Sequence, residues 1–259
     1  MRDQPSSRGS SPTSKTDLQA DTVTTTPVSG PSHAASFSLN ADGTFSYTHD
    51  GSENLSDSFT YEVTDALGIP VTLSLNLANW LHYPEIFEAS EARGWDVMAH
   101  GLYNTRYHWN MTEDEEREAI SDCVEIYRRL TGRHLRGWFS PAATWTDQTP
   151  DLVAEAGISH YCDWYHDDQP TEMNVRSGRL ITIPYQMDIN DAMVWRHHFE
   201  AEDFARMVRD HFDRLWREGE GQGRVCCIAL HPYISGQPHR IRPLERALRH
   251  IVERDGVWL

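Results

Sequence analysis

Residues 94–101 read GWDVMAHG and residues 225–232 read VCCIALHP. In both stretches a short apolar run ends at a histidine, His100 in the first and His231 in the second. Amphipathic runs typical of helices, such as residues 112–130, separate stretches of this kind along the chain. Strands that alternate with helices predict a parallel α/β sheet or barrel.

The strand–helix alternation begins near Gly68 and continues to Leu259. We expect strands at residues 71–75, 96–99, 135–139, 158–162, 180–183 and 225–230, and helices at residues 82–92, 112–130, 149–156, 201–217 and 241–252. The helix over residues 112–130 has the clearest limits. Thr112 and Glu115 form a capping-box pattern at its start, and Gly132 follows its end.

Composition excludes several classes of protein. The 259 residues carry a formal net charge of −16, which argues against a nucleic-acid partner because phosphate binding needs a basic surface. No apolar run is long enough to span a membrane as a helix, and residues 1–22 lack the apolar core of a secretory signal. The four cysteines have no CxxC spacing, so we interpret them as reduced thiols and expect a cytoplasmic location.

Two segments precede the alternating region. Residues 1–32 are rich in Ser, Thr, Pro and Asp, and we expect a disordered tail. Residues 33–67 have the two-residue period of half-buried strands, and Asp42-Gly43 is a hairpin turn signal. The stretches LNADGTFSYTHDGSEN and DSFTYEVTD resemble cadherin-like (VCBS) repeats of bacterial adhesins, of which only a part is present. The acidic side chains of this segment suggest calcium sites or, as we favour, solvated turns; they are Asp42, Asp50, Glu53, Asp57 and Asp65.

Polar residues follow one predicted strand after another. In parallel α/β folds, the residues just past the carboxyl ends of the strands meet at one edge of the sheet. At these positions stand His100, Ser140, Pro141, Asp163, Trp164, Asp167, Asp168, Tyr185, Asp188, Asn190, Asp191 and His231. Two histidines and several carboxylates at one edge are typical of a hydrolytic acid–base site, with or without a metal. By contrast, His108, His197 and His198 follow no strand and are interpreted as surface residues.

The motifs GWDVMAHG, RGWFSP, DWYHDDQP, IPYQMDIND and IALHPYISGQPHR resemble the polysaccharide deacetylase family, and specifically its allantoinase-like branch of amide and ureide hydrolases. The resemblance covers residues 69–259. It implies a distorted (β/α) barrel and hydrolysis of a carbon–nitrogen bond. In metal-dependent members, an Asp on the first strand and two His hold a divalent metal, a second Asp on that strand is the general base, and a late His is the general acid.

The resemblance assigns roles to individual residues. His100 matches the first His of the metal motif, but Asn104 stands where the second is expected. Because the allantoinase-like branch is reported to work without a metal, we expect no cofactor and disfavour a divalent metal bound through His100. His231 matches the general acid, and Asp163 is the third candidate catalytic residue. The expected substrate-binding residues are Arg136, Pro141, Trp164, Asp167, Asp168, Tyr185 and Asn190, with Arg136 paired to Asp163.

The first strand of the family, with its catalytic Asp, has no counterpart. Asp65 is too close to the next strand for a parallel crossover. We therefore expect an incomplete barrel over residues 68–259 that hydrolyses amides, ureides or N-acetyl sugars poorly or not at all. Alternative hypotheses are a calcium-binding adhesion module and a non-catalytic small-molecule-binding protein. The sequence leaves the exact substrate and the oligomeric state open.

Overall fold

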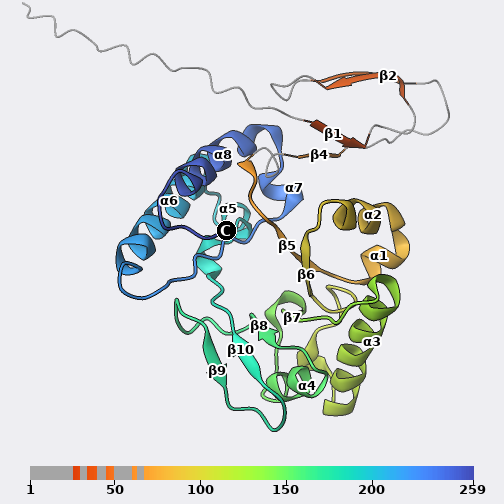
Figure 1. The fold of residues 1–259 in the computed structure, drawn as a ribbon. Coiled ribbons are helices and arrows are strands. Elements are labelled where there is room, and N and C mark those ends of the chain that lie inside the picture. Colours follow the sequence, from red (N-terminus) through yellow and green to blue (C-terminus); the bar gives the residue numbers. More distant parts are fainter. Residues whose placement is uncertain (1–25, 30–33, 40–44, 50–59, 63–66) are drawn as a thin grey trace, which may run out of the picture.

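The computed structural model describes residues 26–29, 34–39, 45–49, 60–62 and 67–259. From residue 67 onward the chain forms a six-stranded sheet flanked by helices (Figure 1). Nowhere in these ranges is a helix both long and apolar enough to cross a membrane.

The strands before residue 67 form two separate pairs. β1 (Thr26–Ser29) pairs antiparallel with β4 (Thr60–Glu62), and β2 (Ala34–Leu39) pairs antiparallel with β3 (Phe45–His49). The second pair confirms the predicted hairpin, although its Asp42-Gly43 turn lies outside the described residues, as do all five acidic candidates for calcium. The tail prediction is wrong for the four residues of β1, because β4 supplies them with a partner strand. The rest of the predicted tail lies outside the described residues.

The central sheet has the order β5-β6-β7-β8-β10-β9. All neighbours are parallel except β9, which runs antiparallel to β10 at one edge. Its strands are β5 (Thr72–Leu75), β6 (Asp96–Ala99), β7 (Gly137–Trp138), β8 (His160–Tyr161), β9 (Thr171–Met173) and β10 (Leu180–Thr182). The other edge is β5, and none of the described strands pairs with its outer side. This confirms the predicted α/β fold class.

Some of the helices pack against the sheet, and the others pack against one another in a second apolar core. They are α1 (Ala78–His82), α2 (Pro84–Ala92), α3 (Glu113–Thr131), α4 (Thr149–Glu155), α5 (Ala192–Arg196), α6 (Ala201–Glu218), α7 (Pro232–Ser235) and α8 (Pro238–Val252). At the start of α3, Thr112 and Glu115 cap each other as predicted, and Gly132 ends the helix in the left-handed region. The helix predicted at residues 82–92 is divided at Tyr83, because a residue that precedes proline avoids the helical region.

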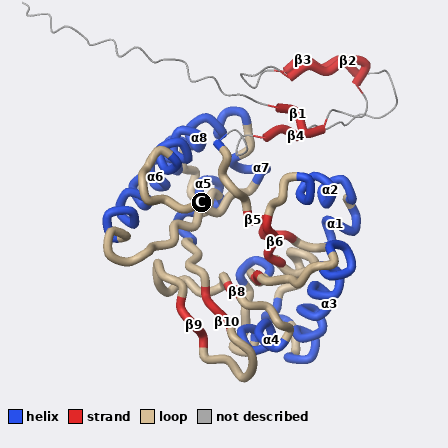
Figure 2. Tube along the Cα trace, in the orientation of Figure 1, coloured by secondary structure: helices blue, strands red, loops and turns tan. Residues whose placement is uncertain are grey.

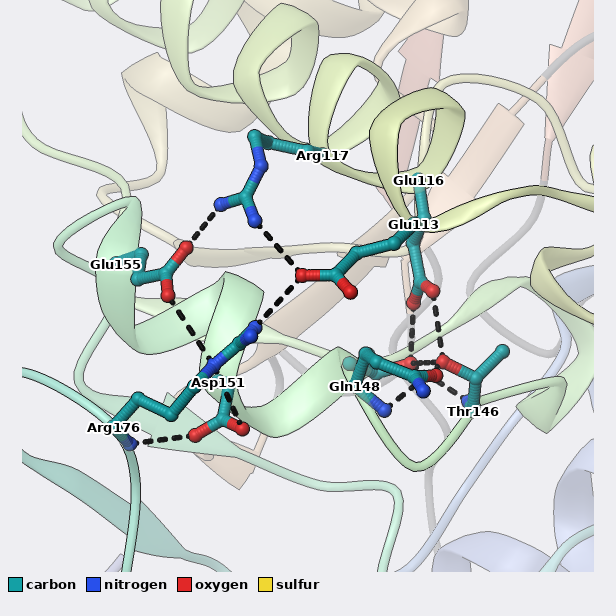
Figure 3. Close-up of polar contacts among 9 residues, drawn as sticks. Glu113, Glu116, Arg117, Thr146, Gln148, Asp151, Glu155 and Arg176 are labelled. Carbon is teal, nitrogen blue, oxygen red and sulfur yellow. Dashed lines mark hydrogen bonds and ion pairs between the residues drawn. The ribbon is translucent and has the colours of Figure 1, made fainter.

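Ion pairs fasten α3 to α4 and to the turn before β10 (Figure 3). Arg117 on α3 contacts Glu113 on the same helix and Glu155 on α4. Arg176, which lies between β9 and β10, reaches Glu113 at 3.0 Å and Asp151 at 3.1 Å. This network joins three elements on the outside of the sheet.

The buried side chains form two main apolar cores. The first lies between β5–β10 and α1–α4 and includes Trp80, Trp138 and Tyr161. The second lies between α5, α6 and α8, where α6 and α8 run side by side, and includes Phe204 and Phe212 (Figure 1). We call residues 71–183 the sheet region and residues 184–257 the helical region. Figure 2 shows that the strands of the central sheet all belong to the sheet region.

The strand predicted at residues 225–230 is wrong. Only Ala229 makes a β-bridge, in parallel with Asn190, and the whole segment is half-buried. An apolar run becomes a regular strand only where neighbouring backbones complete its hydrogen-bond ladder. In the described chain, this segment has the one bridge and a single further backbone hydrogen bond, from Val225 to the carbonyl of Asp168 at 2.9 Å, so it forms an extended loop and not a regular strand.

Candidate functional site

His231 and Asp191 form a hydrogen-bonded dyad at the end of the 225–230 segment. Nδ1 of His231 lies 2.7 Å from Oδ1 of Asp191. The other carboxylate oxygen accepts the backbone N–H groups of His231 at 2.8 Å and Ser235 at 3.2 Å. Asp191 is fully buried, whereas the His231 side chain is 37% exposed. The carboxylate therefore fixes the imidazole with Nδ1 inward and leaves Nε2 for the solvent side.

The Asn190–Ala229 bridge places this dyad. The backbone N–H of Asp191 donates to the carbonyl of Ala229 at 3.0 Å, which brings residue 191 next to the chain that leads into His231. Sequence analysis counted Asp191 among the strand-end residues but gave it no catalytic role. The signal that it missed was pairing: the two segments that end at these residues lie side by side.

His100 lies at the carboxyl end of β6, as predicted. Its Nδ1 donates to the carbonyl oxygen of Phe139 at 3.0 Å, and the side chain of Asn104, which stands where the second His of the metal motif was expected, is also hydrogen-bonded to His100. Burial lowers the pKa of His100, and the nearby charge of His231 adds to this effect. The two histidines therefore lie within electrostatic range of each other, although His231 follows no regular strand.

Asn76 is a second residue that sequence analysis missed. Its side-chain amide donates to the carbonyl oxygen of His100, and the backbone N–H of Leu77 donates to Gly101 at 3.1 Å. Asn76 stands directly after β5, so the strand-end rule that selected His100 would also have selected it. It fixes the turn that carries His100.

A row of aromatic rings extends from His100 to Tyr165. His100 stacks on Phe139 with ring centroids 4.8 Å apart, and Phe139 stacks on Tyr185 at 4.6 Å. Tyr165 lies 5.7 Å from Tyr185. The Tyr185 hydroxyl accepts a hydrogen bond from Asn190 at 2.9 Å, so its own proton remains to be donated. Asn190 itself is buried and also accepts from Ala192, so it supports Tyr185 instead of facing a ligand.

Asp163 holds a loop in place. It is fully buried, and its two oxygens accept the backbone N–H of Ser140 at 2.8 Å and the Ser140 hydroxyl at 2.7 Å. Burial raises its pKa to about 6, partly offset by these hydrogen bonds. With both oxygens occupied, Asp163 positions the loop that follows β7. That loop packs Pro141 against Gly101, next to His100.

Arg136 does not join this site, and its predicted pairing with Asp163 is wrong. Arg136 precedes β7 and therefore lies at the amino-terminal edge of the sheet, whereas Asp163 follows β8 at the carboxyl edge. In place of Asp163 it contacts Asp96, the first residue of β6, at 3.4 Å, and both side chains are exposed. Adjacent parallel strands keep the two edges apart.

The remaining predicted residues divide between the groove and its surroundings. Trp164 is exposed and lies 6.2 Å from the ring of Trp145, so the two rings form an apolar wall. Asp167 closes a turn by accepting the N–H of Asp168 at 2.6 Å. Asp168 faces α6, where its charge acts on His211. Their assignment as substrate-binding residues stays a prediction.

His108, interpreted from the sequence as a surface residue, is buried beneath the site. Its Nδ1 lies 2.9 Å from Oε1 of Glu116, and both side chains are 1% exposed. Burial raises the pKa of Glu116, but hydrogen bonds from His108, Thr149 and Thr146 outweigh this effect and hold it below the usual range. The 3-10 turn at His108–Asn110 brings the ring under Trp138, a placement that no strand-end rule could predict.

Residues 42–161 match the family model described as polysaccharide deacetylase, and residues 4–77 match a bacterial Ig domain model. A protein of Schizosaccharomyces pombe that carries the name of a polysaccharide deacetylase is 28% identical over 196 residues, which cover 68% of this chain and 60% of that protein. The peptidoglycan deacetylase of Helicobacter pylori is 24% identical over 64% of this chain and 67% of its own length. The crystal structure of PuuE allantoinase superposes with a TM-score of 0.70 at 29% identity, covering 75% of this chain and 65% of that one.

These matches support a polysaccharide deacetylase-type domain and the fold predicted for it. This chain spans about 60% of the S. pombe protein and 65% of the allantoinase. The Ig match agrees only coarsely with the predicted cadherin-like repeat, since both domains are β-sandwiches. The overlapping family matches, at residues 4–77 and 42–161, draw no boundary between the two segments.

The family match overturns the prediction of a cofactor-free protein. Hydrolases of the polysaccharide deacetylase family depend on a divalent metal, typically zinc, cobalt or manganese. Residues 67–259 and the four strands described before them bring together no group of three His, Cys, Asp or Glu side chains that could hold an ion. A catalytic zinc site takes three protein ligands. Of the family's three protein ligands, only His100 has a match among the described residues. These residues alone therefore do not fit the metal.

Proposed function

We propose that this protein is a hydrolase of carbon–nitrogen bonds other than peptide bonds. The observation that carries the proposal is the His231–Asp191 dyad, which lies within electrostatic range of His100. The polysaccharide deacetylase match and the relatives support the same reaction class. They favour it over the adhesion-module hypothesis, and an assay of turnover separates it from non-catalytic binding.

His231 and His100 have distinct tasks in the proposed reaction. Hydrolysis of an amide needs a proton on the departing nitrogen. His231 can deliver it from Nε2, because Asp191 holds Nδ1 and stabilises the protonated ring. His100, held through Nδ1 by the carbonyl of Phe139, can exchange its hydrogen bond to Asn104 for one to water or substrate.

The proposed substrate is a small amide, a ureide or an N-acetyl sugar. Named relatives cover this range: one is a peptidoglycan deacetylase and a structural neighbour is an allantoinase. The wall formed by Trp164 and Trp145 provides flat apolar surface on which a sugar or ureide ring can pack. The Tyr185 hydroxyl keeps a proton that it can donate to a polar substrate.

The test is hydrolysis of N-acetylglucosamine oligomers and of allantoin by the whole chain, with manganese, cobalt or zinc added in turn. We expect slow turnover that falls by about 10²–10⁴-fold in His231→Gln, because a general acid contributes about that factor. His160→Gln is the matched control, since His160 lies in β8 at the other side of the sheet beside Arg136. Unchanged turnover in His231→Gln, or no hydrolysis of any amide or ureide under all metals, would contradict the proposal.

A further inference from the structure

Two consecutive alanines near His100 have a backbone conformation that alanine disfavours. Ala142 has a φ of 51° and Ala143 has a φ of 56°. In this left-handed region Cβ lies too close to the following carbonyl oxygen, so residues other than glycine stay there only where the surrounding structure holds them. Residues 139–144, which we call the alanine loop, therefore need contacts that fix their conformation.

The alanine loop makes contacts that fix His100. The carbonyl oxygen of Phe139 accepts a hydrogen bond from Nδ1 of His100 at 3.0 Å. Pro141 packs against Gly101, where its ring occupies the space that a side chain on residue 101 would need. A change in the conformation of the loop would shift both contacts and would therefore move His100.

His108 is linked to the alanine loop by two routes. Its backbone N–H donates to the hydroxyl oxygen of Thr144 at 3.1 Å, and that hydroxyl donates to the carbonyl of Pro141 at 2.6 Å. The centroid of its ring lies 5.7 Å from that of Trp138, whose indole N–H donates to the hydroxyl of Ser140 at 3.1 Å. The two routes reach the loop on opposite sides of the two alanines, one before them and one after them.

Glu116 on α3 keeps His108 in this position. Nδ1 of His108 lies 2.9 Å from Oε1 of Glu116, and both side chains are 1% exposed. The same carboxylate accepts hydrogen bonds from the hydroxyls of Thr146, at 2.8 Å, and of Thr149 (Figure 3). Burying a carboxylate costs free energy, which these partners offset. The buried pair therefore has a fixed place on α3, from which His108 can hold the alanine loop.

We propose that His108 is a positioning residue for the reaction, which holds the strained alanine loop in the conformation that fixes His100. This role rests on the proposed function, because it acts through His100. The side chain of His108 is too deeply buried to touch a substrate, so its effect is carried by the loop. Without His108, Ala142 and Ala143 relax towards conformations that alanine favours, and the contacts of the loop to His100 loosen.

The conformation of the loop can be followed by hydrogen exchange without any substrate, so this result is independent of the proposed function. The backbone N–H groups of Ala143 and Thr144 donate to the carbonyls of Ser140 and Pro141, and they report on the loop directly. His108→Gln in the whole chain should accelerate their exchange by about 10-fold or more, with a smaller change in α6.

Thr144→Val tests the same link and leaves the buried ion pair in place, so it covers the case in which His108→Gln fails to fold. Valine has nearly the same shape but lacks the hydroxyl that contacts His108 and Pro141, so exchange in the loop should accelerate here as well. Thr131→Val is the matched control. It removes a hydrogen bond from a hydroxyl to the carbonyl of Tyr127 at 2.8 Å, near the end of α3, and should leave the loop unchanged.

Glycine at the two strained positions separates positioning from a general loss of stability. Glycine adopts the left-handed conformation without the steric cost that alanine has. Adding Ala142→Gly and Ala143→Gly to the His108→Gln chain should therefore slow exchange in the loop again. Turnover should follow the loop: His108→Gln should lower kcat by up to about 10²-fold with little change in KM, and the glycines should restore part of it.

Unchanged exchange in the alanine loop of both His108→Gln and Thr144→Val would overturn the proposal, as would glycines that accelerate exchange further. A loop that exchanges faster in His108→Gln while kcat keeps its unaltered value would also overturn it. An unaltered chain without any turnover would contradict the proposed function, and the exchange measurements would still show whether His108 holds the loop.

Discussion

The sheet region and the helical region hold their functional histidines in different ways. His100 follows β6, a strand with parallel partners on both sides. His231 follows a segment with a single bridge, and the Asp191 carboxylate replaces the missing ladder with three hydrogen bonds. A sheet can position a catalytic side chain through its backbone, and a buried carboxylate can do so without a sheet. The position of His231 therefore depends on a few polar contacts, and the position of His100 depends on the packing of the sheet.

The largest expected effect concerns the packing of the sheet region. Trp138→Ala removes a fully buried side chain from its core and should lower the free energy of unfolding by about 3–5 kcal/mol. Because the two regions have separate apolar cores, hydrogen exchange should accelerate more in β5–β8 than in α6 and α8. Trp109→Ala, which changes a tryptophan that is 68% exposed, is the control and should alter stability little. Equal acceleration in both regions would show that they unfold together.

Features that depend on residues adjacent in the chain could be predicted from the sequence, and features that depend on distant segments could not. The limits of β6 and the capping box of α3 were predicted correctly, because both depend on residues adjacent in the chain. The pairing of Arg136 with Asp163 was wrong, since it required knowing which edge of the sheet each residue occupies. The dyad of Asp191 and His231 depends on a bridge between distant segments, and the apolar run at residues 225–230 gave no sign that it would lack strand neighbours.

A second prediction concerns the pH dependence contributed by Asp163. Its folded pKa of about 6 lies above its ordinary value of 3.8 because of burial. Between these values the folded protein holds a proton that the unfolded chain releases, so stability from this group falls as pH rises from about 4 to about 6. The shift of roughly two units corresponds to at most about 3 kcal/mol.

Asp163→Asn should remove this part of the pH dependence, because an amide resembles the protonated carboxyl. The measurement is urea unfolding at a series of pH values for both proteins. Asp96→Asn, at an exposed position on the opposite edge, is the control and should leave the slope in place. Parallel curves for the unaltered chain and Asp163→Asn would contradict the assignment.

The smallest expected effect lies in the surface ion pairs of the sheet region. Arg117→Gln removes the contacts to Glu113 and Glu155 (Figure 3). All three side chains are partly exposed, so the loss should be within about 1 kcal/mol and should shrink further in high salt. Arg206→Gln, which breaks exposed pairs on α6, is the matched change in the helical region. A loss above about 2 kcal/mol in Arg117→Gln would mean that the network is structurally essential.

The most direct test of the central claim is a double-mutant cycle across the dyad. If Asp191 acts by orienting and stabilising His231, then Asp191→Asn should lower turnover, and adding it to His231→Gln should cost little more. Turnover is measured for the two single variants, the double variant and the unaltered chain, with the same substrate and metal. The account predicts that the double variant is about as slow as His231→Gln alone. Independent losses that multiply in the double variant would show that the two residues do not work as one unit.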